Sequence, residues 1–189
     1  MIRDAALAIA GMWLAFILFW VFEATRAKRR AKGSALPNLI RILVLAAIAL
    51  SLRVFLGSHL VRQAVGPIAT SPVVAIAGAV VCALGIGIAF WARVYLGRNW
   101  GMPMSLREGH ELVTSGPYAY VRHPIYSGIF LALIGTSVVE GRWWFVFLAV
   151  FFAYFVYAAV VEERTMREQF PKDYPAYVRR TKMLVPFVL

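Results

Sequence analysis

The residues His110-Glu-Leu-Val-Thr-Ser-Gly-Pro-Tyr-Ala-Tyr-Val-Arg-His-Pro-Ile-Tyr126 form a polar stretch between two apolar segments of the chain. The stretch contains two histidines, three tyrosines, an arginine and two prolines. A second polar cluster, Glu162-Glu163, comes directly after the last apolar run. Ionisable groups are costly beside the lipid interior and usually serve a function there. The two clusters therefore predict a functional site at one face of a membrane.

The composition supports a membrane protein. Hydrophobic residues make up 61% of the 189 residues, against about 45–50% in an ordinary soluble domain, and the mean hydropathy is +0.72. The net charge of +11 comes from basic residues that lie mostly between apolar runs. This pattern favours contact with anionic lipid headgroups and argues against nucleic acid as a partner.

The apolar residues are grouped into segments of membrane-spanning length. A helix needs about 20 apolar residues to cross a hydrocarbon core of about 30 Å. We predict an all-α integral membrane protein with about five transmembrane helices and a helical C-terminal tail on the cytoplasmic side. One domain covers residues 1–189, with three membrane helices in 1–92 and a loop, a helical hairpin and the tail in 93–189. The apolar segments lie near residues 5–24, 39–56, 72–92, 125–139 and 143–161.

Several local patterns refine this prediction for the second half of the chain. Gly128, Ala132 and Gly135 recur at helical spacing and predict a face that another helix approaches closely. The turn Glu140-Gly141-Arg142 predicts an antiparallel pair of helices. Pro124 suits the first turn of a helix, where its missing N–H is not needed.

The basic residues also predict an orientation. Five lie in residues 25–37, four in residues 93–122 and six from Glu162 onward, whereas the intervening loops carry few. The positive-inside rule then places the N-terminus outside and the C-terminus in the cytoplasm. Both polar clusters would share the cytoplasmic face.

Other residues have simpler expected roles. Cys82 lies within an apolar run and is expected to be buried, and the three histidines lack cysteine partners at zinc-ligand spacing. We therefore predict no metal site.

Beyond Gln169, the prolines Pro171 and Pro175 should bend the chain, and Tyr174 and Tyr177 suit the headgroup region of a membrane.

The motifs together resemble a known family. They are similar to motifs of the isoprenylcysteine carboxyl methyltransferases and their bacterial and archaeal membrane relatives. The segments that carry the similarity are His110-Glu-Leu-Val, Thr114-Ser-Gly-Pro-Tyr118 and Arg122-His-Pro-Ile-Tyr126, with Glu162-Glu163 one helical hairpin later. The tail sequences Phe170-Pro-Lys-Asp-Tyr174 and Leu184-Val-Pro-Phe187 also resemble this family. The similarity runs from near Leu96 to the end of the chain.

The resemblance implies an integral-membrane enzyme that uses S-adenosyl-L-methionine and a lipophilic acceptor from the bilayer. Arg122 and Glu163 are candidates for positioning groups, and no catalytic base is assigned. The choice of Glu162 over Glu163 as a cofactor ligand stays open. By motif, the implied cofactor-binding residues are His110, Glu111, Leu112, Val113, Tyr118, His123, Pro124, Ile125, Tyr126 and Glu162.

These residue types suit such a cofactor. A carboxylate can hold an ammonium or ribose hydroxyls through charge-assisted hydrogen bonds, and tyrosine rings attract a sulfonium cation. The eukaryotic enzymes place a substrate-handling arginine about one turn before the glutamate pair, where this chain has Ala158. The acceptor is therefore best described as a lipophilic molecule, with a prenylcysteine-like carboxylate as one candidate.

Alternative interpretations remain for both the function and the residues. The chain could methylate a phospholipid amine or a small thiol, or it could be a membrane reductase or lipid-binding protein with the same helices. His123 could simply cap the helix that follows it. The tyrosines could be interfacial anchors, and Glu162-Glu163 could be a solvated helix end. The oligomeric state is not predicted.

Overall fold

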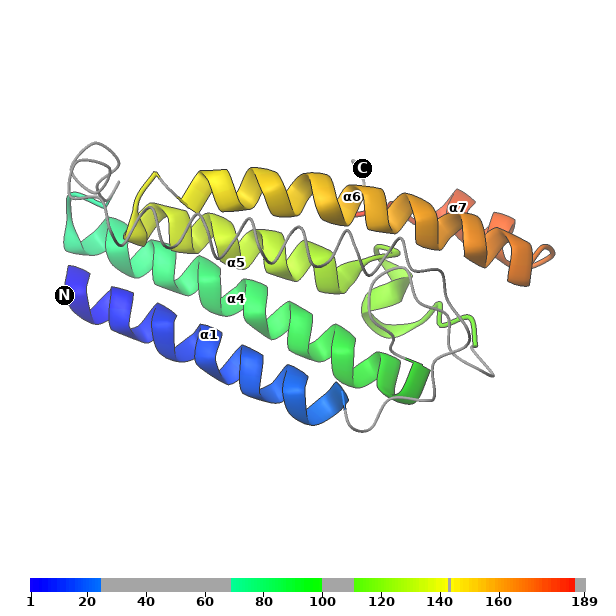
Figure 1. Cartoon of the computed structure of the whole chain (residues 1–189), viewed down its shortest axis with the longest axis horizontal. Helices are drawn as coiled ribbons and strands as arrows, with labels where there is room; N and C mark the ends of the chain where they lie inside the picture. The colour runs from blue at the N-terminus through cyan, green and yellow to red at the C-terminus, as the bar shows by residue number, and fades with distance from the viewer. Residues whose placement is uncertain (25–68, 100–110, 143, 186–189) are drawn as a thin grey trace.

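The computed structural model describes residues 1–24, 69–99, 111–142 and 144–185. Within these ranges all the regular elements are helical, apart from an isolated bridge between Val121 and Lys182 (Figure 1). The predicted segment 39–56 and His110 lie outside the described residues. The elements are α1 (Ile2–Ala24), α4 (Pro72–Leu96), η1 (Gly97–Asn99), η2 (Gly116–Ala119), α5 (Pro124–Glu140), α6 (Trp144–Gln169) and α7 (Tyr174–Arg180).

Three of these helices are long and apolar enough to cross a membrane, namely α1, α4 and α6. They correspond to the first, third and fifth apolar segments of the sequence, and their predicted type is confirmed. Large apolar side chains such as Leu14, Leu18 and Leu84 remain exposed on their outer faces, as expected for surfaces that contact lipid. The total of five crossings stays a prediction.

Helix α5 has only 17 residues and packs against α1, α4 and α6. The predicted small-residue face meets α4, where glycine also recurs. A Cβ built on Gly128 would lie 2.6 Å from the carbonyl oxygen of Gly85 and 2.7 Å from the backbone nitrogen of Ala89. Small residues therefore allow the two helix backbones to approach closely. The prediction of a close helix contact is confirmed.

A tight turn joins α5 to α6. Gly141 has φ 117°, a conformation that side chains rarely adopt, and its N–H donates to the carbonyl of Ser137 at 3.1 Å. In Figure 1 the two helices run antiparallel beside each other, as predicted from Glu140-Gly141-Arg142. Residues 124 and 162 are consequently brought to the same end of the bundle.

The structure corrects the expected limit of the third apolar segment. The sequence pattern places Arg93 among the loop charges, but it lies within α4 and is fully buried. Its guanidinium forms an ion pair with Glu23 at 3.1 Å and donates to the Gly97 carbonyl at 2.8 Å. A buried charge is tolerated when it is paired and hydrogen-bonded, so the helix can continue beyond residue 92. The pair also fixes the end of α1 to the end of α4.

Polar side chains of α1, α4 and α5 also contact one another inside the bundle. Trp13 Nε1 donates to Thr136 Oγ1 at 3.0 Å, and Thr136 Oγ1 donates to the Ala132 carbonyl at 2.8 Å. Cys82 is buried, as predicted, with its sulfur 3.6 Å from Thr136 Oγ1. These contacts connect α1, α4 and α5 within the apolar interior.

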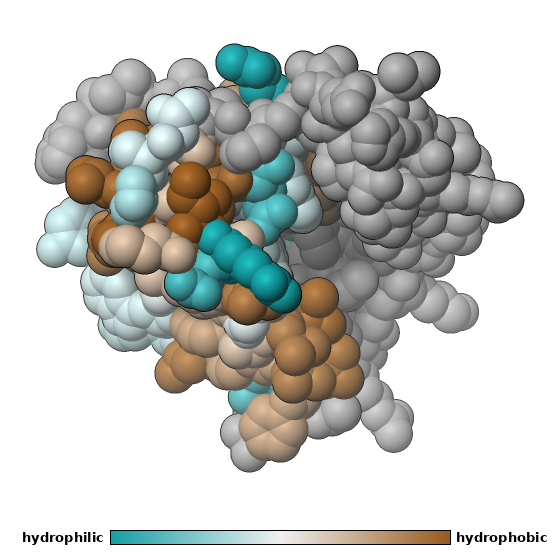
Figure 2. All heavy atoms as spheres, turned by 90° about the vertical axis from the view of Figure 1, so that its left-hand side faces the viewer, coloured by the Kyte–Doolittle hydropathy of each residue, from teal (hydrophilic) through white to brown (hydrophobic). Residues whose placement is uncertain are grey.

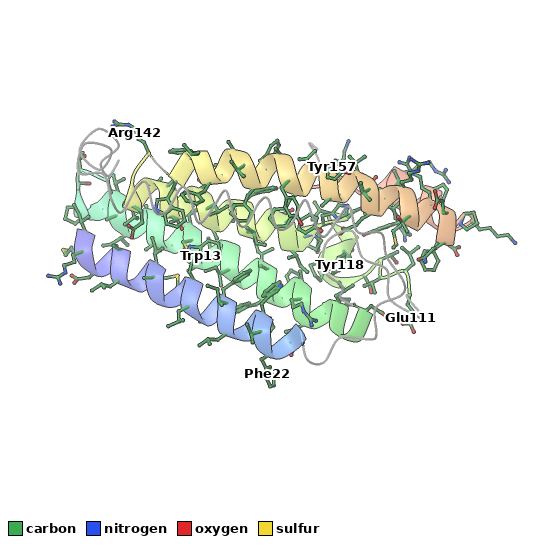
Figure 3. The ribbon with its side chains drawn as sticks, viewed as in Figure 1. Trp13, Phe22, Glu111, Tyr118, Arg142 and Tyr157 are labelled. Carbon is green, nitrogen blue, oxygen red and sulfur yellow. The ribbon has the colours of Figure 1, made fainter. Side chains whose placement is uncertain are left out.

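The two ends of the bundle differ. Figure 2 views the end opposite the polar motifs, where hydrophilic and hydrophobic side chains are mixed. Figure 3 shows Arg142 at that end and Glu111 and Tyr118 at the other, while Phe22 points away from the bundle. The candidate site lies at the end that carries Tyr118.

Candidate functional site

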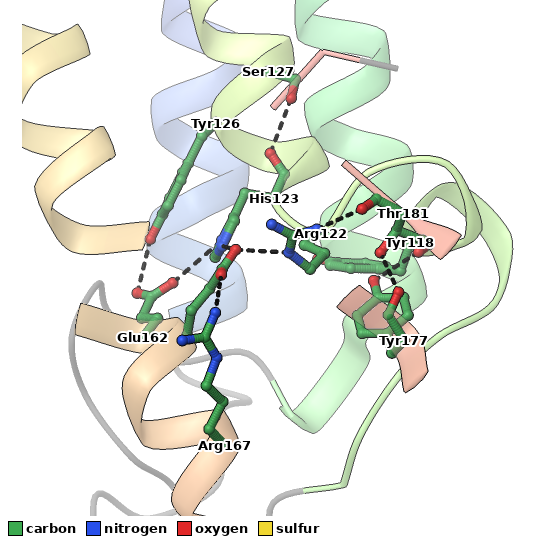
Figure 4. A network of polar contacts seen from close by, with 10 residues as sticks. Tyr118, Arg122, His123, Tyr126, Ser127, Glu162, Arg167, Tyr177 and Thr181 are labelled. Carbon is green, nitrogen blue, oxygen red and sulfur yellow. Dashed lines mark hydrogen bonds and ion pairs between the residues drawn. The ribbon is translucent and has the colours of Figure 1, made fainter. Parts of the chain in front are cut away.

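The two polar clusters recognised in the sequence meet in space (Figure 4). Tyr126, in the first turn of α5, donates its hydroxyl to Glu162 Oε1 at 2.8 Å. Arg122, two residues before α5, donates from Nε to Glu163 Oε1 at 2.6 Å. The α5–α6 hairpin accounts for this meeting, because it returns the chain to the end at which α5 begins.

His123 lies between the two carboxylates. It occupies the N-cap position of α5, yet its side chain makes no capping hydrogen bond. Its Nδ1 is 3.5 Å from Glu162 Oε2, and its Nε2 is 3.6 Å from Glu163 Oε1. The ring is parallel to that of Tyr126, with centroids 5.3 Å apart. His123 is therefore part of the polar network, and capping does not explain the orientation of its side chain.

The adjacent glutamates have different surroundings. The Glu163 side chain is 7% exposed and faces two arginines, with Arg122 at 2.6 Å and Arg167 at 3.7 Å. The Glu162 side chain is 25% exposed and accepts the hydroxyl of Tyr126. Glu163 is thus largely neutralised by cations of this chain, whereas Glu162 is the more accessible carboxylate.

The C-terminal tail is attached directly to the start of α5. The N–H of Arg122 donates to the Lys182 carbonyl at 2.8 Å, and the N–H of His123 donates to the Met183 carbonyl at 3.1 Å. Arg122 Nη1 also donates to the Thr181 carbonyl at 2.6 Å. Arg122 therefore links α6, the loop before α5 and the tail, which orients the backbone of His123.

The tail tyrosines are a correction to the sequence interpretation. Tyr174 and Tyr177 were expected in the headgroup region, but they are only 2% and 3% exposed. Tyr177 donates its hydroxyl to the Tyr118 carbonyl at 2.6 Å. Burial raises the pKa of Tyr177 well above its usual value, so the hydroxyl stays protonated and can donate at any ordinary pH. Tyr177 thus holds the tail to the loop, and both tyrosine side chains are covered by protein.

The other residues of the motifs lie around this network. Tyr118 is buried, and its hydroxyl donates to the Ala92 carbonyl at 3.4 Å. Ile125 belongs to the hydrophobic core, and Val113 packs against the same cluster. Glu111 is exposed and accepts a hydrogen bond from Asn99 Nδ2, with a distance of 3.4 Å to its Oε2. Leu112 is half-buried and Pro124 is buried.

Some members of the network were not identified from the sequence. Arg167 lies four residues after Glu163, a spacing that brings opposite charges together on a helix, so it could have been found. No comparable spacing in the sequence indicates that Ser127, Thr181 and Tyr177 belong to this network. Ser127 donates to the Leu184 carbonyl, and a contact of this kind depends on how the tail folds back.

Comparison with known proteins gives the family. A family model described as phospholipid methyltransferase matches residues 73–173, which is more than half of the chain. The chain belongs to the phospholipid methyltransferase family. The matched region of this family member begins in α4 and extends through the α5–α6 hairpin to the start of the tail.

Curated relatives support the resemblance seen in the motifs. "Protein-S-isoprenylcysteine O-methyltransferase B" of Arabidopsis thaliana is 33% identical over 101 residues, covering 51% of this chain and 51% of the relative. "Nickel-cobalt-cadmium resistance protein NccN" of Alcaligenes xylosoxydans xylosoxydans is 34% identical over 107 residues, covering 54% of this chain and 49% of the relative. The chain thus spans about half the length of these relatives.

A solved structure shares the fold. The structure of the "eukaryotic intramembrane Ras methyltransferase ICMT (isoprenylcysteine carboxyl methyltransferase)" aligns with a TM-score of 0.54 and 20% identity. The alignment covers 84% of this chain and 55% of that chain. Together with the three long apolar helices, the shared fold identifies this family member as an integral membrane protein.

Proposed function

We propose that this chain is a membrane methyltransferase that uses S-adenosyl-L-methionine and transfers a methyl group to a lipophilic acceptor. The observation that carries the proposal is the cluster of Tyr126, His123 and Glu162 at one end of the bundle. Its residues come from the motifs through which the chain resembles membrane methyltransferases. From the distribution of basic residues, we place this end in the cytoplasm and the N-terminus outside.

The residues of the cluster suit the cofactor. Glu162 is a partly exposed carboxylate able to bind an ammonium or ribose hydroxyls. The ring of Tyr126 packs against those of His123 and Phe155, with centroids 5.3 and 4.4 Å away, and its hydroxyl is directed at that carboxylate. Glu162 is therefore preferred to Glu163 as the cofactor ligand. The motif resemblance assigns the remaining residues of the proposed pocket, which are His110, Glu111, Leu112, Val113, Tyr118, Pro124 and Ile125.

The work of the protein in this reaction is mainly orientation. S-adenosyl-L-methionine supplies a methyl group on a sulfonium sulfur, and its transfer leaves a neutral thioether. Tyr126 fixes the direction of the Glu162 carboxylate, and Arg122 positions His123 by holding Glu163 and the tail. Correct orientation of reactants can lower a barrier by about 7–11 kcal/mol. A carboxylate or thiolate acceptor needs no general base.

Two classes of acceptor follow from the comparisons. The isoprenylcysteine methyltransferase relatives favour the carboxylate of a prenylcysteine-like lipid, and the description of the family favours a phospholipid amine. An amine acceptor would have to lose a proton during the reaction, which a carboxylate would not. Incubating the protein with labelled cofactor and bilayer lipids, and then identifying the labelled product by mass spectrometry, distinguishes the two.

Ala158 provides a test of the acceptor class. It is fully buried in α6, one turn before Glu162. An arginine placed there would be enclosed by protein, and a buried unpaired charge destabilises a fold by several kcal/mol. We expect Ala158→Arg to lower the melting temperature, and an acidic lipid acceptor to restore part of the loss. Equal recovery with a neutral lipid would argue against a carboxylate near this position.

Titration calorimetry tests the cofactor. We expect the purified protein to bind S-adenosylhomocysteine with micromolar affinity, about −8 kcal/mol, and to show no saturable binding of NADPH. A membrane reductase with the same helices would show the opposite pattern. Binding of NADPH without S-adenosylhomocysteine would therefore overturn the proposed function.

A further inference from the structure

A groove of about 610 Å³ runs along α6, α7 and the tail residues that follow α7. It lies next to the polar network, because Arg122 and Thr181 belong to both. One part of its lining is apolar, with Phe152 and Val156 from α6. The other part is basic, with Arg179, Arg180 and Lys182 in addition to Arg122. No acidic residue is among its described lining residues.

The positive charge of the groove has little compensation within the described part of the chain. Arg122 is paired with Glu163. The side chains of Arg179, Arg180 and Lys182 are exposed, and no ion pair joins any of them to an acidic side chain of the described residues. The guanidinium of Arg180 lies over the Tyr177 ring, 5.8 Å from its centroid. Arg179 and Lys182 are the cations most readily directed toward a ligand.

The apolar part of the groove lies deeper along α6. Phe152 and Val156 are four residues apart and share one face of the helix. They precede Glu162 by about 9–15 Å at 1.5 Å per residue, within the apolar run of a helix long enough to cross the membrane. Phe152 is 47% exposed. The groove is thus basic near the end of the bundle and apolar toward the membrane interior.

We propose that this groove binds an anionic phospholipid of the surrounding bilayer, with the phosphate near Arg179 and Lys182 and an acyl chain along Phe152 and Val156. The charge of the basic part matches a phosphate, and the apolar part matches a hydrocarbon chain. A soluble phosphate would leave the apolar face uncovered, and a neutral lipid would leave the cations unpaired. The inference does not depend on methyl transfer.

Native mass spectrometry of the whole chain in detergent can measure this binding. The protein is titrated with dioleoyl phosphatidylglycerol and with dioleoyl phosphatidylcholine, without any methyl donor. Each basic residue near an anionic lipid strengthens association about fivefold. We therefore expect Arg179→Gln/Lys182→Gln to weaken phosphatidylglycerol binding about 25-fold and to leave phosphatidylcholine binding unchanged.

Arg164→Gln/Lys172→Gln is the matched control. Both residues are exposed and basic, lie near the same end of the chain and do not line the groove. We expect this variant to retain at least half of the wild-type affinity. A similar loss in both double variants would show that only the overall charge matters, and would overturn the proposal.

A second variant tests the apolar part independently. Phe152→Ser removes an exposed ring and should weaken phosphatidylglycerol binding several-fold without changing the circular dichroism spectrum. Unchanged affinity in this variant would contradict the placement of the acyl chain. Displacement of the lipid by equimolar inorganic phosphate would identify a simple anion site instead. Because no cofactor is present, either result leaves the methyltransferase proposal intact.

Discussion

Glu162→Gln is expected to weaken S-adenosylhomocysteine binding about 10- to 100-fold, because it removes a charge-assisted hydrogen bond of about 1.5–3 kcal/mol. The glutamine carbonyl can still accept the Tyr126 hydroxyl, so the local structure should be kept. The melting temperature should change by no more than about 2 °C, since a partly exposed group contributes little to stability. Calorimetry and thermal unfolding measure the two effects separately.

Glu163→Gln is the matched comparison one residue away. Glu163 is buried beside Arg122, and breaking a buried ion pair costs about 3–5 kcal/mol. We expect a marked loss of thermal stability and a smaller direct loss of affinity. If Glu163→Gln weakened binding more than Glu162→Gln while both proteins stayed folded, the roles of the two carboxylates would be reversed.

Gly85→Ala is expected to cause one of the largest losses of stability among single changes in the membrane helices. A Cβ at this position would overlap the backbone nitrogen of Ala132 and lie 2.5 Å from the Gly128 carbonyl oxygen. Both neighbours are backbone atoms, so α4 and α5 would have to separate. Overpacking of this kind costs about 1–3 kcal/mol. Thermal unfolding in detergent should show a melting temperature lower by several degrees.

Gly87→Ala provides the control within the same helix. A Cβ at Gly87 meets nothing within 4 Å, and alanine favours a helix over glycine by about 0.5–1 kcal/mol. We expect an unchanged or slightly higher melting temperature. If Gly85→Ala and Gly87→Ala behaved alike, close contact of the backbones would not be what holds α4 to α5.

The hairpin of α5 and α6 shows why part of the fold was predictable. Its two apolar runs, the glycine at the turn and the small-residue face are local patterns with a direct physical meaning. The pairing of Glu162 with Tyr126 was not itself predicted, but the hairpin required both to lie at the same end. The motif similarity then identified Tyr126 and Glu162, among many other polar residues, as candidates for the site.

Arg93 shows where local patterns failed. An arginine after an apolar run is normally a loop residue, and the sequence around it contains no acidic partner within one helical turn. Its partner is Glu23, at the end of α1 and 70 residues away. A pairing at that distance depends on how α1 packs against α4, which no local pattern describes.

From the sequence alone, the all-helical membrane architecture, a helix face of small residues that another helix approaches closely, and the family could be inferred. Hydropathy, glycine spacing and motifs are local properties of the sequence, whereas only the structure shows that α4 is the helix that meets this face. The different surroundings of Glu162 and Glu163 came from the folded structure, as did the burial of Tyr174 and Tyr177 and the groove beside α6. These features depend on the tail, which returns to the start of α5 through backbone hydrogen bonds. Almost any residue type can make such bonds, so the sequence carries no signal for them.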